Sequence, residues 1–176
     1  MAAQPATAAT AGSVAVCLAL GSNLGDRHAT IMRAVEALCR EVGPIVAATP
    51  VVQTEPWGYE STHAYLNAIT LHLTRLSPAR LLAVTQAIEH SLGRTAKTPA
   101  AGSAAAGIDA AGSSAGPLPP YADRPIDIDI LLYGHLHMAT PELTIPHPRI
   151  TERPFVSGPL RELLARNTGI DICRAP

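Results

Sequence analysis

Apolar and polar positions in the first part of the chain predict a strand, a helix and a second strand. Residues 14–20 (VAVCLAL) are continuously apolar, which is typical of a buried strand. The next segment, GSNLG (21–25), lacks the ending of a phosphate-binding P-loop, so turn geometry accounts for its glycines. Asp26 can cap a helix in which apolar residues recur at helical spacing until Pro44 ends it. Residues 45–53 are predicted to form the second strand.

Strand and helix patterns continue in the second part of the chain. Residues 65–74 are predicted to form a third strand. Ser77 as the N-cap and Pro78 at the first helical position begin a second helix, which ends at Gly93. Residues 126–133 (IDIDILLY) alternate between apolar and polar, and this pattern predicts a fourth strand.

The predicted order, β-α-β-β-α-β, indicates an α+β fold of the ferredoxin-like type. Such a sandwich has an antiparallel sheet with helices on one face, which leaves the other face for an active site. Beyond the fourth strand we expect a hairpin-like piece and a helix near residues 159–166. We expect residues 14–176 to form a single domain after a disordered tail, residues 1–13. Residues 95–120 are nearly all Ala, Gly, Ser and Pro and are predicted to be a flexible insertion, because they cannot bury enough apolar surface to order.

Composition and charge exclude several classes of function. The net charge is −1, from 13 basic and 14 acidic residues without a basic cluster, so the chain lacks the charge pattern of a protein that binds nucleic acid or anionic membranes. Cys17, Cys39 and Cys173 are far apart and indicate neither a disulfide framework nor a zinc site. The N-terminus lacks the pattern of a signal peptide, and no apolar stretch is long enough to span a bilayer. We therefore expect a cytoplasmic protein without nucleic-acid or membrane partners.

The strongest chemical signal is the pair of aspartates in the fourth predicted strand. Alternation directs the isoleucines toward a core and places Asp127 and Asp129 side by side on the opposite face. Two carboxylates this close repel each other unless a cation or a proton lies between them. A Mg²⁺ ion held by one or two carboxylates and by substrate phosphates is a common arrangement. The pair therefore indicates metal and phosphate chemistry; the alternative is a half-exposed edge strand with solvated acids.

Two arginines flank the predicted insertion and lie near the aspartates in the sequence. Arg94 precedes the insertion, and Arg124 follows it just before the aspartate strand. Phosphoryl transfer spreads negative charge over phosphate oxygens, and guanidinium groups match that geometry. We interpret Arg94 and Arg124 as phosphate-binding residues; the alternative is that both are ordinary surface arginines.

Other residues are typical of a site for a flat heteroaromatic ligand. Such a ligand stacks on an aromatic ring and bonds to an amide that both donates and accepts hydrogen bonds. Tyr65, Asn67 and Phe155 supply these groups in a chain with only 3% aromatic residues. Core packing is the alternative for Tyr65 and Phe155. His147 could donate to a phosphate, although a lone histidine is more often structural.

Six segments occur in the chain in a fixed order: LALGSNLGDR (18–27), TEPWG (54–58), YLNAI (65–69), QAIEHSLGR (86–94), RPIDIDILLYG (124–134) and LTIPHPRITERPF (143–155). Together they resemble the 6-hydroxymethyl-7,8-dihydropterin pyrophosphokinases of folate biosynthesis. The resemblance implies that the protein transfers the diphosphoryl group of MgATP to the pterin hydroxymethyl group and releases AMP. Its partners would be these two small-molecule substrates, and nothing in the sequence requires more than a monomer.

The resemblance also implies roles for individual residues, by matching position. Asp127 and Asp129 would hold two Mg²⁺ ions, and Arg94 and Arg124 would steady the transferring group. The ATP site would be formed by Gln86, Glu89, Arg94, Tyr121, Arg124, Ile130, Thr144, His147 and Arg153. The pterin site would be formed by Thr54, Glu55, Trp57, Tyr65, Asn67 and Phe155, with the pterin between the rings of Tyr65 and Phe155.

The sequence departs from the family pattern before the aspartate strand. The family's loop there is short and has a second arginine and a Trp, whereas this chain has its long Ala/Gly-rich insertion and Tyr121 in the place of the Trp. We expect this difference to affect loop closure and rate rather than reaction type. Two other functions fit part of the pattern: a two-metal nucleotidyltransferase, and a non-enzymatic ferredoxin-like ligand-binding module.

Overall fold

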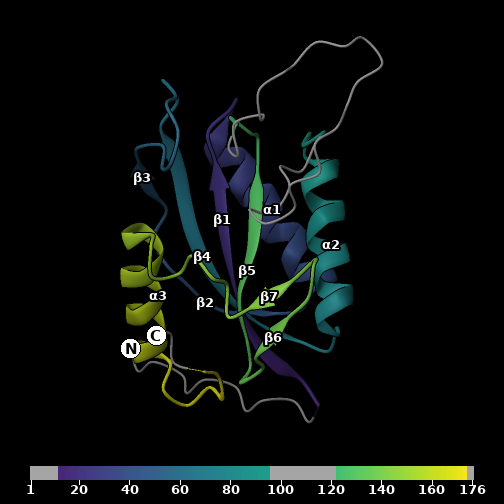
Figure 1. The fold of residues 1–176 in the computed structure, drawn as a ribbon. Coiled ribbons are helices and arrows are strands. Elements are labelled where there is room, and N and C mark those ends of the chain that lie inside the picture. Colours follow the sequence, from purple (N-terminus) through teal and green to yellow (C-terminus); the bar gives the residue numbers. More distant parts are fainter. Residues whose placement is uncertain (1–11, 96–121, 174–176) are drawn as a thin grey trace, which may run out of the picture.

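The computed structural model describes residues 12–95 and 122–173 (Figure 1). Most of the predicted tail, nearly all of the predicted insertion, and Tyr121 lie outside these described ranges. The elements in chain order are β1 (Val14–Ser22), α1 (Arg27–Glu41), β2 (Ile45–Ala48), β3 (Val52–Thr54), β4 (Tyr65–Thr74), α2 (Pro78–Ser91), β5 (Asp127–Tyr133), β6 (Met138–Ala139), β7 (Thr144–Ile145) and α3 (Pro154–Arg166). In the part of the chain that the structure describes, no helix has the length and apolar character needed to cross a membrane.

The main sheet has the strand order β2-β4-β1-β5, and every neighbouring pair is antiparallel. The central pair, β1 and β4, is in register from Val14 opposite Thr74 to Ser22 opposite Leu66. Since the first and last strands of the βαββαβ series are neighbours and the two middle strands form the other half of the sheet, this is the predicted ferredoxin-like topology. The short strands β6 and β7 form a separate two-stranded sheet, which corresponds to the predicted hairpin-like piece.

Two helices begin where the sequence predicts. The Asp26 side chain accepts a hydrogen bond from Ala29 N and caps α1, and the Ser77 side chain accepts one from Arg80 N and caps α2. The chain leaves α2 through Gly93, whose φ of +96° is strained for residues with a side chain.

Two predicted elements differ from the structure. The strand predicted over residues 45–53 is two strands, β2 and β3, and both pair with β4. Between them the pairing shifts by one residue, from Ala48 opposite Thr70 to Val52 opposite Asn67. At this point the side chain of Thr49, instead of its carbonyl, accepts the bond from Ile69 N at 2.9 Å. Helix α3 begins at Pro154, earlier than the predicted start near Pro159, and continues through that proline.

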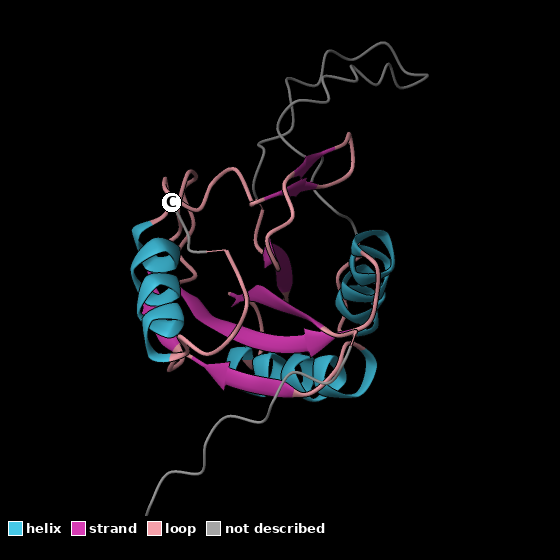
Figure 2. Cartoon of the chain, turned by 90° about the horizontal axis from the view of Figure 1, so that it is seen from below, coloured by secondary structure: helices cyan, strands magenta, loops and turns pink. Residues whose placement is uncertain are grey.

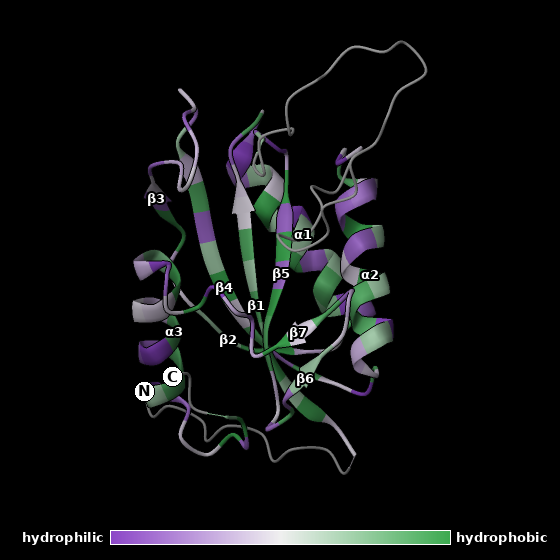
Figure 3. Ribbon diagram, viewed as in Figure 1, coloured by the Kyte–Doolittle hydropathy of each residue, from purple (hydrophilic) through white to green (hydrophobic). Residues whose placement is uncertain are grey.

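The sheet packs on helices on both sides, as the view from below shows (Figure 2). Helices α1 and α2 cover one face, where Leu18, Ile31, Leu38 and Leu81 are fully or almost fully buried. Helix α3 packs on the other face, and its residues share a second core with β1, β4 and β5. In Figure 3, β1 is hydrophobic along most of its length, as expected for a strand that is covered on both faces, whereas hydrophilic and hydrophobic residues alternate along the first part of β5. The part of the second face that remains accessible beside α3 carries the candidate site.

Candidate active site

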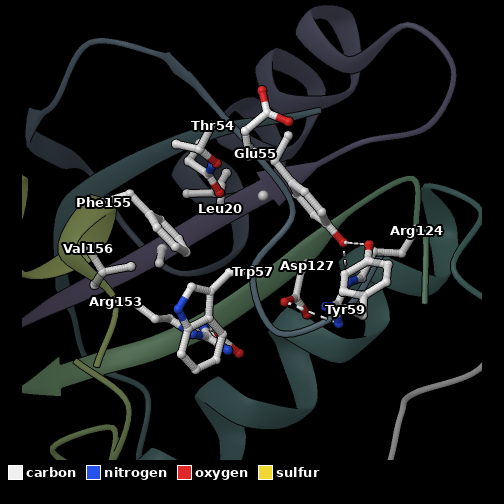
Figure 4. Close-up of a pocket in the computed structure, with 15 residues that line it drawn as sticks. Leu20, Thr54, Glu55, Trp57, Tyr59, Arg124, Asp127, Arg153, Phe155 and Val156 are labelled. Carbon is white, nitrogen blue, oxygen red and sulfur yellow. Dashed lines mark hydrogen bonds and ion pairs between the residues drawn. The ribbon is translucent and has the colours of Figure 1, made fainter. Parts of the chain in front are cut away.

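A pocket lies on the face of the sheet opposite α1 and α2, beside the start of α3 (Figure 4). Strands β1, β4 and β5 supply its floor, and the loop between β3 and β4 and the first turn of α3 supply its walls. The residues that line it are Ala19, Leu20, Gly21, Thr54, Glu55, Trp57, Tyr59, Tyr65, Asn67, Arg124, Asp127, Asp129, Arg153, Phe155 and Val156. The pocket therefore contains the two aspartates and all six residues predicted for the pterin site.

The aspartates follow the predicted alternation along β5. Ile128 and Ile130 are buried in the core against the two helices, whereas the side chains of Asp127 and Asp129 keep 19% and 25% of their surface exposed and line the pocket. Burial opposes ionisation of Asp127, but the charges of Arg124 and Arg94 outweigh it and lower the pKa of the carboxyl. Asp127 is therefore a carboxylate at neutral pH.

Among the described residues, no group of three or more His, Cys, Asp or Glu side chains could hold a metal ion by itself. The donor set at the site is the oxygens of Asp127 and Asp129, which suit Mg²⁺, an ion that is commonly bound by one or two carboxylates together with water and phosphate oxygens. The residues present thus fit Mg²⁺ that arrives with a phosphate ligand.

Each aspartate is paired with basic side chains. Asp127 Oδ1 lies 2.5 Å from Arg94 Nη1, and Asp127 Oδ2 lies 3.4 Å from Arg124 Nη1. Asp129 Oδ2 lies 3.1 Å from Arg153 Nη1 and 3.9 Å from His147 Nε2. Of these arginines, Arg124 and Arg153 line the pocket beside the two carboxylates, so their guanidinium groups are available to phosphate oxygens.

Glu89 forms a buried ion pair with Arg94. Both residues are buried, with 7% and 3% of their surface exposed, and Arg94 Nη1 donates to Glu89 Oε1 at 2.5 Å. The same Glu89 oxygen accepts a hydrogen bond of 2.7 Å from Ile128 N. Glu89, predicted to contact ATP, is thus placed between the end of α2 and the backbone of β5, where its carboxylate fixes Arg94.

The predicted pterin residues lie in one place although they come from distant parts of the chain. Asn67 Nδ2 donates to Thr54 Oγ1 at 2.8 Å, which joins β4 to the end of β3. The guanidinium carbon of Arg153 lies 5.3 Å from the centre of the Trp57 ring, a cation–π distance that fixes the loop against the start of α3. Gly21 belongs to β1 and not to a turn; a Cβ there would lie 3.1 Å from Asn67 Oδ1, so the glycine makes room for that side chain.

The remaining residues predicted for the ATP site are more dispersed. Thr144 is on β7, and Gln86 is exposed on α2. The side chain of Ile130 is 3% exposed in the core beneath the sheet, so only its backbone could contact a nucleotide. Burial lowers the pKa of His147, and the negative charge of Asp129 offsets only part of this shift. The structure therefore brings His147 and Arg153 to the aspartates, and leaves Gln86 at the surface.

Sequence reasoning missed a group of residues at the edge of the pocket. Asn23, Tyr59 and His63 all contact the carboxylate of Asp123, the residue immediately before Arg124. The only signal in the sequence was the position of Asp123 next to a candidate arginine. Nothing in the pattern links residues 23, 59, 63 and 123, because they come from three loops that are far apart in the sequence.

Comparison with protein families and with curated proteins gives one consistent result. Residues 17–165 match the family model described as 7,8-dihydro-6-hydroxymethylpterin-pyrophosphokinase. The chain is 43% identical over 149 residues to a 2-amino-4-hydroxy-6-hydroxymethyldihydropteridine pyrophosphokinase of Porphyromonas gingivalis, an overlap of 84% of this chain and 89% of that protein. It is 35% identical over 147 residues to the protein of the same name from Bacillus subtilis, an overlap of 83% of this chain and 75% of that protein.

Solved structures agree on the fold. The chain superposes on a Plasmodium falciparum HPPK-DHPS with a TM-score of 0.53 and 14% sequence identity, over 82% of this chain and 39% of that one. A second HPPK-DHPS, crystallised with substrates, gives a TM-score of 0.55 at 12% identity, over 86% of this chain and 40% of that one. This chain therefore spans less than half of either of these longer chains.

Proposed function

The chain belongs to the 7,8-dihydro-6-hydroxymethylpterin-pyrophosphokinase family, and we propose from this membership how its own residues carry out the reaction. The protein transfers the diphosphoryl group of ATP to the hydroxymethyl group of 6-hydroxymethyl-7,8-dihydropterin in folate biosynthesis. The hydroxymethyl oxygen of the pterin loses its proton and attacks the β-phosphorus, the bond from that phosphorus to the oxygen of the α-phosphate breaks, and AMP leaves. Neither the nucleotidyltransferase nor the binding-module alternative is retained.

One observation supports the assignment of the site. The two carboxylates and the predicted pterin residues line the same pocket, with Arg124 and Arg153 among them. A pterin between Tyr65 and Phe155 would have its hydroxymethyl group in reach of a polyphosphate held at Asp127 and Asp129. Positioning and charge neutralisation supply most of the catalysis in phosphoryl transfer, so this juxtaposition is the main requirement.

We propose that Asp127 and Asp129 hold two Mg²⁺ ions together with the phosphates of ATP. When bound, the ions would neutralise charge on the β- and γ-phosphates. Arg124 and Arg153 are placed to bind phosphoryl oxygens, since each already lies within 3.4 Å of an aspartate oxygen at the pocket. Arg94 has less freedom, because Glu89 and Asp127 both bind its Nη1 atom. Its proposed role is therefore to fix Asp127, and through it the transferring group.

The metal count is tested with Mn²⁺, which can be followed by electron paramagnetic resonance. In the presence of α,β-methylene ATP, the wild-type protein is expected to bind two Mn²⁺ ions per chain, and Asp129→Ala fewer than two. Without the nucleotide analogue we expect much weaker binding, because two carboxylates alone are an incomplete ligand set. One Mn²⁺ per chain in the wild-type ternary complex would contradict the two-ion proposal.

Phe155→Ala is expected to raise the KM for the pterin about tenfold or more, and to leave the KM for ATP within about twofold. The reason is the loss of one of the two aromatic faces, since a stacking contact contributes on the order of 1 kcal/mol beyond its buried area. Steady-state kinetics with each substrate varied in turn measures both constants. The matched control is Met32→Ala, a large apolar residue of α1 that is 43% exposed on the other side of the sheet. An unchanged pterin KM in Phe155→Ala would remove Phe155 from the site.

We further propose that the chain acts as a cytoplasmic monomer, with residues 14–176 as its single domain and without nucleic-acid or membrane partners. The near-zero net charge supports the absence of nucleic-acid and anionic-membrane partners, because it gives no attraction to polyanions. The plant relatives called folate synthesis bifunctional proteins are longer; one from Pisum sativum is matched over only 26% of its length.

A further inference from the structure

We propose that Asp123 is a positioning residue, which couples the loop of the pterin site to Arg124 through a directional chain of hydrogen bonds. This inference rests on the roles proposed above for Tyr65 and Arg124. It concerns residues that neither the family match nor the sequence pattern assigned.

The backbone of Arg124 is fixed by Asn23. Arg124 N donates to Asn23 Oδ1 at 2.7 Å, and Asn23 N donates to Arg124 O at 3.2 Å. Asn23 is only 2% exposed, so its amide has little access to water. Its Nδ2 donates to Asp123 Oδ1 at 2.7 Å. Because a carboxylate only accepts hydrogen bonds, Asp123 helps to set which end of the Asn23 amide faces Arg124, together with the carbonyl of His63, which accepts from the same Nδ2 at 3.3 Å.

The same carboxylate holds the loop between β3 and β4. Tyr59 Oη donates to Asp123 Oδ1 at 2.9 Å, and His63 Nδ1 lies 2.8 Å from Asp123 Oδ2. Burial opposes ionisation of Asp123, but hydrogen bonds from Ser61, Asn23, His63 and Tyr59 outweigh it and lower the pKa to about 2. Since this pKa lies far below neutral pH, all of these contacts are made to a carboxylate.

The side chain of Arg124 is connected to this carboxylate through two phenols. Arg124 Nε lies 3.4 Å from Tyr65 Oη, and Tyr65 Oη lies 2.7 Å from Tyr59 Oη. Arginine only donates and an ionised aspartate only accepts, so the direction of every bond is determined. Arg124 donates to Tyr65, Tyr65 donates to Tyr59, and Tyr59 donates to Asp123.

This series of hydrogen bonds has a charged group at each end, Arg124 and Asp123. Hydrogen bonds to charged groups are stronger than those between neutral groups. The series links the aromatic ring on which the pterin is proposed to stack with the guanidinium proposed to bind phosphate. Asp123 touches neither substrate in this arrangement, so it acts only through Tyr59, Tyr65, Asn23 and Arg124. Displacing its carboxylate would therefore misplace the phosphate-binding and the pterin-binding groups together.

The test is a double-mutant cycle with Asp123→Ala and Tyr59→Phe. Each single variant is expected to lower kcat/KM for the pterin about tenfold, and the double variant also about tenfold, because both break the same chain. Asp123→Asn should retain more activity than Asp123→Ala, since an amide oxygen can still accept from Tyr59. Additive losses, about a hundredfold in the double variant, or no loss in either single variant would overturn the proposal.

Asp171→Ala is the matched control. Asp171 also accepts from a histidine, His135 at 2.6 Å, but this pair is exposed and away from the pocket, so kinetics should not change. Trp57, the only Trp of the chain, gives a second readout. Acrylamide should quench its fluorescence about twofold more effectively in Asp123→Ala, because the loop is released, and should quench Asp171→Ala like the wild type. Unchanged quenching in Asp123→Ala would overturn the loop contact even if that variant were inactive.

Arg124→Ala, measured in parallel, separates this inference from the function it rests on. If Arg124→Ala is slow while Asp123→Ala and Tyr59→Phe are as fast as the wild type, the role of Arg124 is supported and the coupling is overturned. If Arg124→Ala has wild-type kinetics, the proposed role of Arg124 is wrong, and the coupling is overturned with it. Slow turnover in all three variants, with a non-additive double variant, supports both.

Discussion

Asp127→Asn is expected to lower kcat by about a thousandfold or more, while the protein remains folded. The substitution keeps the size of the side chain but removes a negative charge at the point where Mg²⁺ and phosphate are proposed to bind. Arg94 and Arg124, which lie 2.5 and 3.4 Å from Asp127, would lose the carboxylate that now separates them. Arg94 would still be paired with Glu89, so we expect the packing beneath β5 to be preserved.

Rapid-quench or steady-state turnover at saturating MgATP and pterin measures this loss, and a thermal melt checks the fold. Asp171→Asn is the matched control, because it neutralises an exposed aspartate that lies outside the pocket. A kcat within tenfold of the wild type in Asp127→Asn would show that this carboxylate does not hold an essential metal.

Glu89→Ala is expected to lower the free energy of unfolding by about 3 kcal/mol, a large effect for a single substitution. Two buried groups lose a partner in this variant: the guanidinium of Arg94, which keeps its contact with Asp127, and the backbone amide of Ile128. Removing one member of a buried charged pair costs several kcal/mol, and an unsatisfied buried amide adds to this. Turnover should fall as well, because Arg94 would no longer be fixed beneath Asp127.

Urea denaturation at neutral pH measures the loss of stability. Glu162→Ala is the control: Glu162 pairs with Arg166 at 3.3 Å, but both side chains are more than 70% exposed, so the change should stay within about 0.5 kcal/mol. Glu89→Gln should be intermediate, since its amide oxygen can still accept from Ile128. A loss below about 1 kcal/mol in Glu89→Ala would mean that Arg94 finds another partner in the variant.

Most of the fold and the centre of the site could be predicted from the sequence, because both depend on local patterns. Alternation along residues 126–133 determines which side chains of β5 face the core, and the structure places Asp127 and Asp129 in the pocket accordingly. The caps Asp26 and Ser77 depend on contacts three residues away, so their effect can also be recognised locally.

The features that the sequence did not predict depend on contacts between distant segments. The break between β2 and β3 requires the side chain of Thr49 to bond with Ile69 on the neighbouring strand. The structural role of Glu89 requires α2 to end beneath β5, and the contacts of Asp123 require three loops to meet. Residue types alone cannot specify contacts between distant segments, because these contacts follow from the topology of the sheet.

The central claim, that this chain transfers a diphosphoryl group within the pocket on β5, is tested most directly by identifying the nucleotide product. The purified protein is incubated with MgATP and 6-hydroxymethyl-7,8-dihydropterin, with and without the pterin, beside Asp129→Ala. We predict AMP that forms only when the pterin is present and is lost in Asp129→Ala. ADP as the product, or AMP that is independent of the pterin or of Asp129, would contradict the account.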